Sequence, residues 1–376
     1  MAAAVTAYLD HAASTPMRPE AVEAMLPFLT ERYGNPSGSH VAARDARKAV
    51  DEARDVVAEC LGCRPGEVVF TGCGTEADDL AIFGVVRRAG GVAVCAAAEH
   101  HAVLHPVEHL GGRIVGVDRT GLVDLDQLAD ALDDTVTVVS VMLANNEVGT
   151  IQPLAEVAAV VAERASAAVL HTDAVQGAVW LDVAREAAPA QLVSVSAHKF
   201  GGPKGTGALV VRDGVTLEPL LLGGGQERER RSGTHNVAGI VAMAEALRAT
   251  VAERESVTAR VSGLRNRLVD GLAAGVPGLV ETVPRDRKVP GSAHVCLEGV
   301  ESEALLFLLD RAGVCASAAS SCASGAMDPS HVLAAMGVPK EVAVGALRLS
   351  LGFASTDADV DRALDVIPAA VAQLRR

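Results

Sequence analysis

The sequence has few lysines and no long hydrophobic run. Only five of its 33 basic residues are lysines, namely Lys48, Lys199, Lys204, Lys288 and Lys340. No uninterrupted apolar run reaches the ~18 residues that a membrane span needs. Residues 1–10 also contain no basic side chain of the kind that begins a signal or transit peptide. These absences predict a cytoplasmic protein that does not bind membranes.

A basic surface is also missing, because the formal net charge is −14. Proteins that bind a phosphate backbone normally carry a basic face, so we expect no direct contact with nucleic acid. The seven cysteines are an odd number scattered along a chain of 376 residues. This pattern argues against a disulfide framework and fits reduced thiols in a cytosolic setting.

The first two thirds of the chain alternate between two kinds of pattern. Residues 42–61 place apolar side chains at helical spacing. Short runs rich in β-branched residues follow at 68–70, 92–96, 135–143, 168–172, 192–196 and 208–211. Several of these runs are apolar at consecutive positions, as in strands that are covered on both faces. Strands that alternate with helices predict an α/β fold with a mainly parallel sheet.

The pattern changes near residue 255, where we place the start of a second, smaller α+β domain. Residues 252–272 indicate a long polar helix, with a strand near 294–297 and a helix near 303–311. Residues 315–326 are small and uncharged, which is typical of a loop.

Lys199 is the lysine whose position indicates chemistry. It follows the apolar run 192–196, and ligands in open α/β sheets bind at the carboxyl ends of the strands. An amine that is desolvated there has the lowered pKa that covalent chemistry with a carbonyl needs. Lys48, Lys288 and Lys340 lie in charged or turn segments and are expected to be solvated. Asp173 ends another run, where a carboxylate suits the pyridine nitrogen of pyridoxal phosphate (PLP), although helix capping is the ordinary role of such a residue.

Two motifs have competing interpretations. Gly72, Gly74 and Ala77 follow a strand and open a helix, which suits a phosphate. The same spacing fits a dinucleotide fingerprint, with Glu99 as the ribose-binding acid, and so admits an NAD-dependent dehydrogenase. Next along the chain, a row of histidines (His101, His105 and His109) lacks the glutamate of a zinc motif, so we predict no metal site.

Three further segments contain candidate residues. The charge run 226–231 is expected to be a solvated loop, although the Arg-Ser-Gly-Thr at its end is suited to donate to a phosphate. Cys322 lies in the small-residue loop, where reactivity explains a free cysteine better than packing. Arg348 lies in an apolar stretch, and a buried arginine needs an anion such as a substrate carboxylate.

Taken together, these segments resemble the NifS/IscS-type cysteine desulfurases, which are class V aminotransferases of PLP fold type I. The resemblance runs nearly end to end and is carried by Tyr8–Ala13, Tyr33–Ser37, Gly74–Asp78, Ala144–Gly149, His198–Lys199 and Pro329–Leu333. It implies a large PLP-binding domain over residues 15–255 with a seven-stranded, mainly parallel sheet. Residues 1–14 and 256–376 would form the smaller α+β domain that carries the catalytic-cysteine loop.

The resemblance also implies the role of each site residue. Lys199 would bind PLP covalently and shuttle a proton, Asp173 would pair with the pyridine nitrogen, and His100 would stack on the ring and help to move protons. Cys322 would be the nucleophile. The other implied contacts are Gln176 and Asn146 near the ring hydroxyl, Asn146 and Arg348 at the substrate, and Gly74, Thr75, Ser196, His198 and a neighbouring subunit's Thr234 at the phosphate, which implies a homodimer.

The implied reaction takes sulfur from L-cysteine, leaving L-alanine and a persulfide on Cys322. The persulfide would pass to an acceptor protein for iron–sulfur assembly, for thiolation of tRNA or a cofactor, or for phosphorothioation of DNA. A selenocysteine lyase, or another PLP enzyme of the same fold type, is the alternative, and the dehydrogenase is a distant third.

Three positions depart from the pattern of the family. Cys73 stands in the phosphate loop where a glycine is usual, Ala319 replaces the glycine that usually lies three residues before the nucleophile, and Asp79 replaces a common asparagine.

Overall fold

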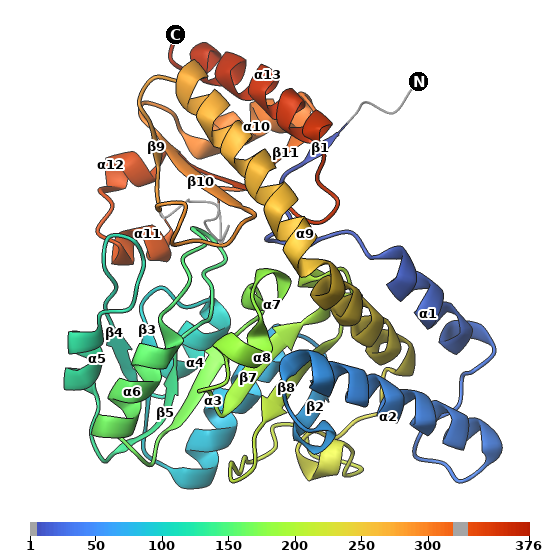
Figure 1. The fold of residues 1–376 in the computed structure, drawn as a ribbon. Coiled ribbons are helices and arrows are strands. Elements are labelled where there is room, and N and C mark those ends of the chain that lie inside the picture. The colour runs from blue at the N-terminus through green and yellow to red at the C-terminus, as the bar shows by residue number, and fades with distance from the viewer. Residues whose placement is uncertain (1–5, 319–329) are drawn as a thin grey trace.

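The computed structural model describes residues 6–318 and 330–376. Its largest element is a seven-stranded sheet with the strand order β2-β8-β7-β6-β5-β3-β4, in the lower half of Figure 1. β8 is antiparallel to both of its neighbours, and the other pairs are parallel. The strands are β2 (Val68–Thr71), β3 (Val92–Ala96), β4 (Arg113–Val115), β5 (Val136–Ser140), β6 (Val169–Asp173), β7 (Leu192–Ser196) and β8 (Gly207–Val211). The sequence predicted all of these strands except the short β4.

The sheet is buried on both faces, which explains its consecutive apolar residues. One face packs on α2 (Val41–Leu61), α6 (Leu154–Arg164) and the first half of α9 (Val237–Gly275). The other face packs on α3 (Gly74–Ala89) and α4 (His101–His109). Along β2, for example, Val68 and Phe70 belong to the first core and Val69 to the second.

A separate core lies in the upper half of Figure 1. It contains the antiparallel sheet of β9 (Leu279–Glu281), β10 (Ser292–Leu297) and β12 (Ala346–Ser350), with α10 (Ser302–Arg311) and α13 (Asp357–Leu374). The paired strands β1 (Ala7–Tyr8) and β11 (Val314–Cys315) join it, so the start of the described chain packs beside its end.

α9 belongs to both cores. Its buried side chains up to Leu247 lie in the large core, and those from Val261 onward lie in the upper core. The helix expected over residues 252–272 is therefore only the second part of a helix that begins at Val237. The division of the chain into two domains near residue 255 stays a prediction.

The remaining helices are shorter. They are α1 (Pro19–Thr30), α5 (Leu125–Ala131), α7 (Gly177–Trp180), α8 (Val183–Glu186), α11 (His331–Ala335) and α12 (Lys340–Ala343), with single 3-10 turns η1 (Pro65–Glu67), η2 (Ala197–Lys199) and η3 (Glu227–Glu229). Within the described residues, no helix is both long and apolar enough to cross a membrane.

Candidate active site

The candidate site lies where the strands of the large sheet end. β6 ends at Asp173, β7 ends at Ser196, and α3 begins just beyond β2. These ends surround a cavity of about 180 Å³. Its walls contain nine of the predicted catalytic and binding residues, namely Gly74, Thr75, His100, Asn146, Asp173, Gln176, Ser196, His198 and Lys199, together with Cys73 of the phosphate loop.

Lys199 lies in η2, directly after β7, and its amine faces the segment that follows β1. Its Nζ donates to the carbonyl oxygens of Ala12 (2.5 Å) and Ala13 (3.1 Å). Burial lowers the pKa of Lys199 to about 8, and the positive charge of Arg348 acts in the same direction. The neutral, nucleophilic form of the amine is therefore far more populated near neutral pH than it is in an exposed lysine.

Asp173 places a buried carboxylate on the floor of the same cavity. Its Oδ1 accepts a hydrogen bond from the backbone N–H of Val175 at 2.8 Å, which fixes the orientation of the side chain. Burial raises the pKa of Asp173 to about 6, while the nearby Lys199 opposes that rise. A desolvated carboxylate of this kind gains most from a cationic partner, and the protonated nitrogen of a pyridine ring is such a partner.

The start of α3 and the end of β7 form a cradle with the properties of a phosphate site. A Cβ on Gly74 would lie 2.9 Å from Val175 Cγ2 and 3.3 Å from Ser196 Cβ, so only glycine leaves the cradle open. The Ser196 hydroxyl is buried and has no hydrogen-bond partner among the described residues. The first amides of a helix also lack acceptors within the helix and favour an anion. The residues present therefore fit PLP: the cradle would hold its phosphate, and Asp173 would pair with its pyridine nitrogen.

Other polar side chains of the cavity are oriented by local hydrogen bonds. His100 Nδ1 accepts from the backbone N–H of Ala102 at 3.1 Å, so in the neutral ring Nε2 carries the hydrogen. Burial lowers the pKa of His100 to about 4, which keeps the ring neutral at physiological pH. Gln176 donates to the carbonyl of Ala12 at 2.9 Å. His198 Nδ1 lies 3.4 Å from the Ser14 hydroxyl.

A second, smaller cavity adjoins the first and has Arg348 in its wall. The two cavities share Asn146, Gln176 and Lys199. Arg348 lies in β12 and is buried, as the sequence indicated. The carboxylate beside it, however, belongs to the protein, since Arg348 Nη2 lies 2.8 Å from Asp10 Oδ1. Asp10 is part of a motif recognised in the sequence, but its spacing gave no hint of this contact.

Cys322 lies outside the described residues. Thr234 lies in the loop between η3 and α9 and lines neither cavity.

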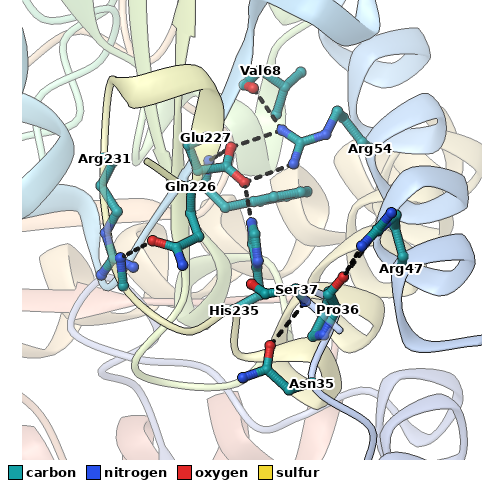
Figure 2. A network of polar contacts seen from close by, with 12 residues as sticks. Asn35, Pro36, Ser37, Arg47, Arg54, Val68, Gln226, Glu227, Arg231 and His235 are labelled. Atoms are coloured by element: carbon teal, nitrogen blue, oxygen red, sulfur yellow. Dashed lines mark hydrogen bonds and ion pairs between the residues drawn. The ribbon is translucent and has the colours of Figure 1, made fainter. Parts of the chain in front are cut away.

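The charge run 226–231 is solvated in part, since Arg228 and Glu229 are exposed as the sequence suggested, but it is tied down at Glu227. Glu227 is buried and accepts from Arg54 Nη1 (2.8 Å) and Nη2 (2.7 Å), from the backbone of Phe70 (2.9 Å), and lies 2.7 Å from His235 Nε2. Figure 2 shows this network between α2 and the loop. The prediction was wrong at Glu227, because periodicity does not reveal a partner 173 positions away in the chain.

Two further expectations are corrected. Glu99 is completely buried and accepts from the backbone of Met142 at 2.6 Å, so it is not free to bind a ribose. Lys288 is buried rather than solvated, and its Nζ lies 2.7 Å from a carboxylate oxygen of Glu281.

The rings of His101 and His105 stack with centroids 4.6 Å apart. Within residues 6–318 and 330–376, no group of acidic, histidine or cysteine side chains has the geometry of a metal site.

Sequence reasoning missed one buried carboxylate of the cavity. Asp78, on α3, is 1% exposed and lies in the cavity wall. Burial raises its pKa well above the usual range, and the neighbouring Asp173 raises it further. Its position in a helix beside charged residues gave no signal of burial.

Comparison with known proteins places this geometry in a family. The aminotransferase class-V family model matches residues 7–363. The chain is 46% identical to an IscS-like cysteine desulfurase of Mycobacterium tuberculosis and 43% identical to the cysteine desulfurase IscS of Methanosarcina thermophila. Each alignment covers 98% of this chain. It covers 97% of the Mycobacterium relative and 92% of the Methanosarcina relative. A solved structure of a NifS-like protein superposes with a TM-score of 0.91 at 35% identity, over 98% of this chain and all of that one. With Lys199 and Asp173 in place at the end of its sheet, the chain belongs to the class-V aminotransferases, among the PLP-dependent cysteine desulfurases.

Proposed function

We propose that the enzyme removes sulfur from L-cysteine through a persulfide on Cys322, with Lys199, Asp173 and Arg348 as the groups that bind cofactor and substrate. The observation that carries this proposal is the arrangement of the two cavities. A lysine with a lowered pKa lies between a buried carboxylate that suits a pyridine nitrogen and a buried arginine that suits an amino-acid carboxylate.

When bound, PLP supplies an aldehyde for the substrate amine and a ring that withdraws electrons from the α carbon. The residues of the chain do the rest. Asp173 keeps the ring nitrogen protonated, Ser196 and the first amides of α3 hold the phosphate, and Arg348 binds the substrate carboxylate. The neutral amine of Lys199 takes the α proton, and His100 Nε2–H is a hydrogen-bond donor to the reacting groups.

Sulfur transfer then takes place at Cys322. Its thiolate attacks the substrate sulfur, an S–S bond forms as the C–S bond breaks, and the electron pair of the C–S bond stays with the carbon fragment. Protonation of that fragment gives alanine, so the substrate carbon is reduced and the sulfur of Cys322 is oxidised to a persulfide.

The experiment is turnover of L-cysteine by the holoenzyme and by Cys322→Ser, without added thiol. We expect the wild type to produce alanine and a persulfide, seen as one extra sulfur by mass spectrometry, and the variant to produce neither while retaining the cofactor spectrum. A selenocysteine lyase would not depend on Cys322. Full sulfur release by Cys322→Ser would therefore favour that alternative.

We also propose a homodimer in which Thr234 completes the phosphate site of the partner. Thr234 lines neither cavity of its own subunit, and the loop before it is held firmly by the Arg54–Glu227 pair. Large apolar side chains are exposed around the same region, namely Leu222 (84%), Tyr33 (79%) and Val41 (73%). The loop 224–228, the segment before α2 and α2 itself line one cavity, so these three parts of the chain lie side by side. Leu222→Glu is expected to yield monomers in sedimentation and to weaken cofactor retention.

We infer that the persulfide sulfur passes to an acceptor protein in the cytoplasm. The six cysteines within the described residues are all free, as in a reducing compartment. Capture of proteins that become disulfide-linked to Cys322 after exposure to L-cysteine tests this step. Iron–sulfur scaffolds, thiolation enzymes and DNA-modifying enzymes are its distinguishable outcomes.

A further inference from the structure

The carboxylate of Asp10 already occupies one side of Arg348. Arg348 Nη2 lies 2.8 Å from Asp10 Oδ1, and its Nη1 donates to the backbone carbonyl of Asn146 at 3.2 Å. Both partners are largely shielded from water, because the side chains of Arg348 and Asp10 are 8% and 23% exposed. A pair with this geometry and burial is charge-neutral as a unit.

Asp10 is held in place by its own backbone rather than by Arg348 alone. It forms a parallel bridge with Ser350, and the backbone N–H groups on either side are bonded, that of Leu9 to the carbonyl of Cys315 (2.9 Å) and that of His11 to the carbonyl of Ser350 (3.2 Å). The Tyr8 hydroxyl also donates to the carbonyl of Asp10 at 3.2 Å. The backbone of Asp10 is therefore fixed beside Arg348, within reach of its guanidinium group.

Arg348 nevertheless keeps donors for a second anion. A guanidinium group has five N–H donors in a planar fork, and two of them account for Asp10 and Asn146. Nε is buried and has no hydrogen-bond partner among the described residues. The side chain lines the smaller cavity, whose wall also includes Lys199. A substrate carboxylate binds the remaining donors while Asp10 stays where it is.

The charge balance of this arrangement selects among amino acids. Arg348 and Asp10 cancel, so the carboxylate of the substrate finds donors but little net positive charge. Once the α-carboxylate of the ligand is bound, it forms with Arg348 and Asp10 a group of one net negative charge, which repels an additional negative charge on the side chain of the ligand. We propose that Asp10 is a specificity-determining residue that excludes amino acids with acidic side chains from the cysteine site. This inference rests on the proposed binding of the substrate carboxylate by Arg348.

The test compares L-aspartate with L-asparagine, two ligands of nearly the same shape that differ by one charge. Their dissociation constants are measured by titrating the holoenzyme and following the absorbance of the bound cofactor. In Asp10→Asn we expect the gain in affinity for L-aspartate to exceed the gain for L-asparagine about tenfold, from a charge interaction over roughly 8–10 Å in a partly desolvated site. L-asparagine carries the same α-carboxylate, which also gains when Asp10 is neutralised, so the effect of the side-chain charge is read from the ratio of the two changes.

Three variants make the result decisive. Asp10→Glu keeps the charge and is expected to keep the discrimination, and Asp10→Ser is a second neutral variant if Asp10→Asn does not fold. If both ligands change by the same factor in the neutral variants, Asp10 only orients Arg348 and the proposal is wrong. Arg348→Lys tests the underlying assignment separately, because unchanged binding of both ligands in that variant would overturn the role of Arg348 and not the charge effect of Asp10.

Discussion

Two buried arginine–carboxylate pairs in this molecule differ in how completely their hydrogen bonds are used. In the pair Arg54–Glu227, both guanidinium Nη groups reach the carboxylate, which also accepts from Phe70 and contacts His235. Arg54 Nη1 additionally donates to the carbonyl of Val68 at 2.7 Å. In the pair Arg348–Asp10, a single contact joins the side chains and Nε has no partner among the described residues.

The difference is the one expected between a structural pair and the pair to which we assign substrate binding. A fully bonded buried pair resists change because removing either partner leaves an uncompensated charge. The backbone conformation around Glu227 is also unfavourable. Glu227, Arg228 and Glu229 are not glycines, yet they have left-handed φ angles of 49°, 56° and 64°. The network holds this turn in place. Arg348, by contrast, keeps donors free, and free donors are what a ligand site requires.

The largest effect is expected from Glu227→Gln, which breaks the structural pair. The buried charge of Arg54 loses its partner, and we expect the free energy of unfolding to fall by about 3 kcal/mol. Urea unfolding of the holoenzyme measures this change. Asp361→Asn, which removes an exposed partner of Arg267, is the matched control and is expected to cost less than about 0.5 kcal/mol. Equal losses in the two variants would contradict the comparison.

The same pair predicts how stability depends on acid. Burial alone would raise the pKa of Glu227, but the hydrogen bonds from Arg54 and His235 hold it at about 2. A carboxyl whose pKa is lower in the folded state stabilises the protein above its unfolded value near 4.5. That contribution, about 3 kcal/mol, is lost as pH falls from about 5 toward 2. We expect Glu227→Gln to flatten this part of the stability profile, and an unchanged slope would show that other carboxyls dominate.

Arg348→Lys tests the second pair, Arg348–Asp10. Lysine keeps the charge but loses the planar fork, so we expect KM for L-cysteine to rise roughly 30-fold while the melting temperature changes little. The equivalent change at the structural pair, Arg54→Lys, is expected to lower the melting temperature and to leave KM for L-cysteine nearly unchanged. Steady-state kinetics and thermal unfolding of both variants check the contrast, which fails if Arg348→Lys lowers stability as much as Arg54→Lys.

The smallest effect concerns the amine of Lys199. Burial and Arg348 lower its pKa to about 8, whereas Asp173 and Asp10 raise it. The rate at which the apoenzyme reacts with added PLP should therefore rise with pH around a midpoint near 8. In Asp10→Asn we expect the midpoint to move to lower pH, because one supporting negative charge is gone. A midpoint that stays in place would show that Asp10 is electrostatically remote from Lys199.

The sequence predicted those parts of the fold and site that depend on local pattern. Strands buried on both faces appear as continuous apolar runs, so β2, β3 and β5 to β8 were predictable. Lys199, Asp173 and Gly74 could be found because each follows a strand, and the ends of parallel strands converge on one edge of the sheet. Resemblance to a known family then gave these positions their chemistry.

What the sequence did not predict depends on contacts between distant segments. The burial of Glu227 requires Arg54, and the contact of Asp10 with Arg348 joins residues 338 positions apart. Asp78 and Glu99 look like ordinary surface acids in their local sequence, yet they are 1% and 0% exposed. Charged residues lie on the surface so often that only the assembled fold reveals the exceptions.

The helix shared by the two cores has a mechanical consequence. At 39 residues α9 is a rod about 58 Å long, and it lacks a proline that would let it kink. Each half is clamped in a different body, one that carries Lys199 and one that carries Arg348. A swing of only about 5° around the middle of such a rod displaces each end by roughly 2.5 Å. Because one continuous helix runs through both bodies, a slight change in its curvature would shift Arg348 relative to Lys199.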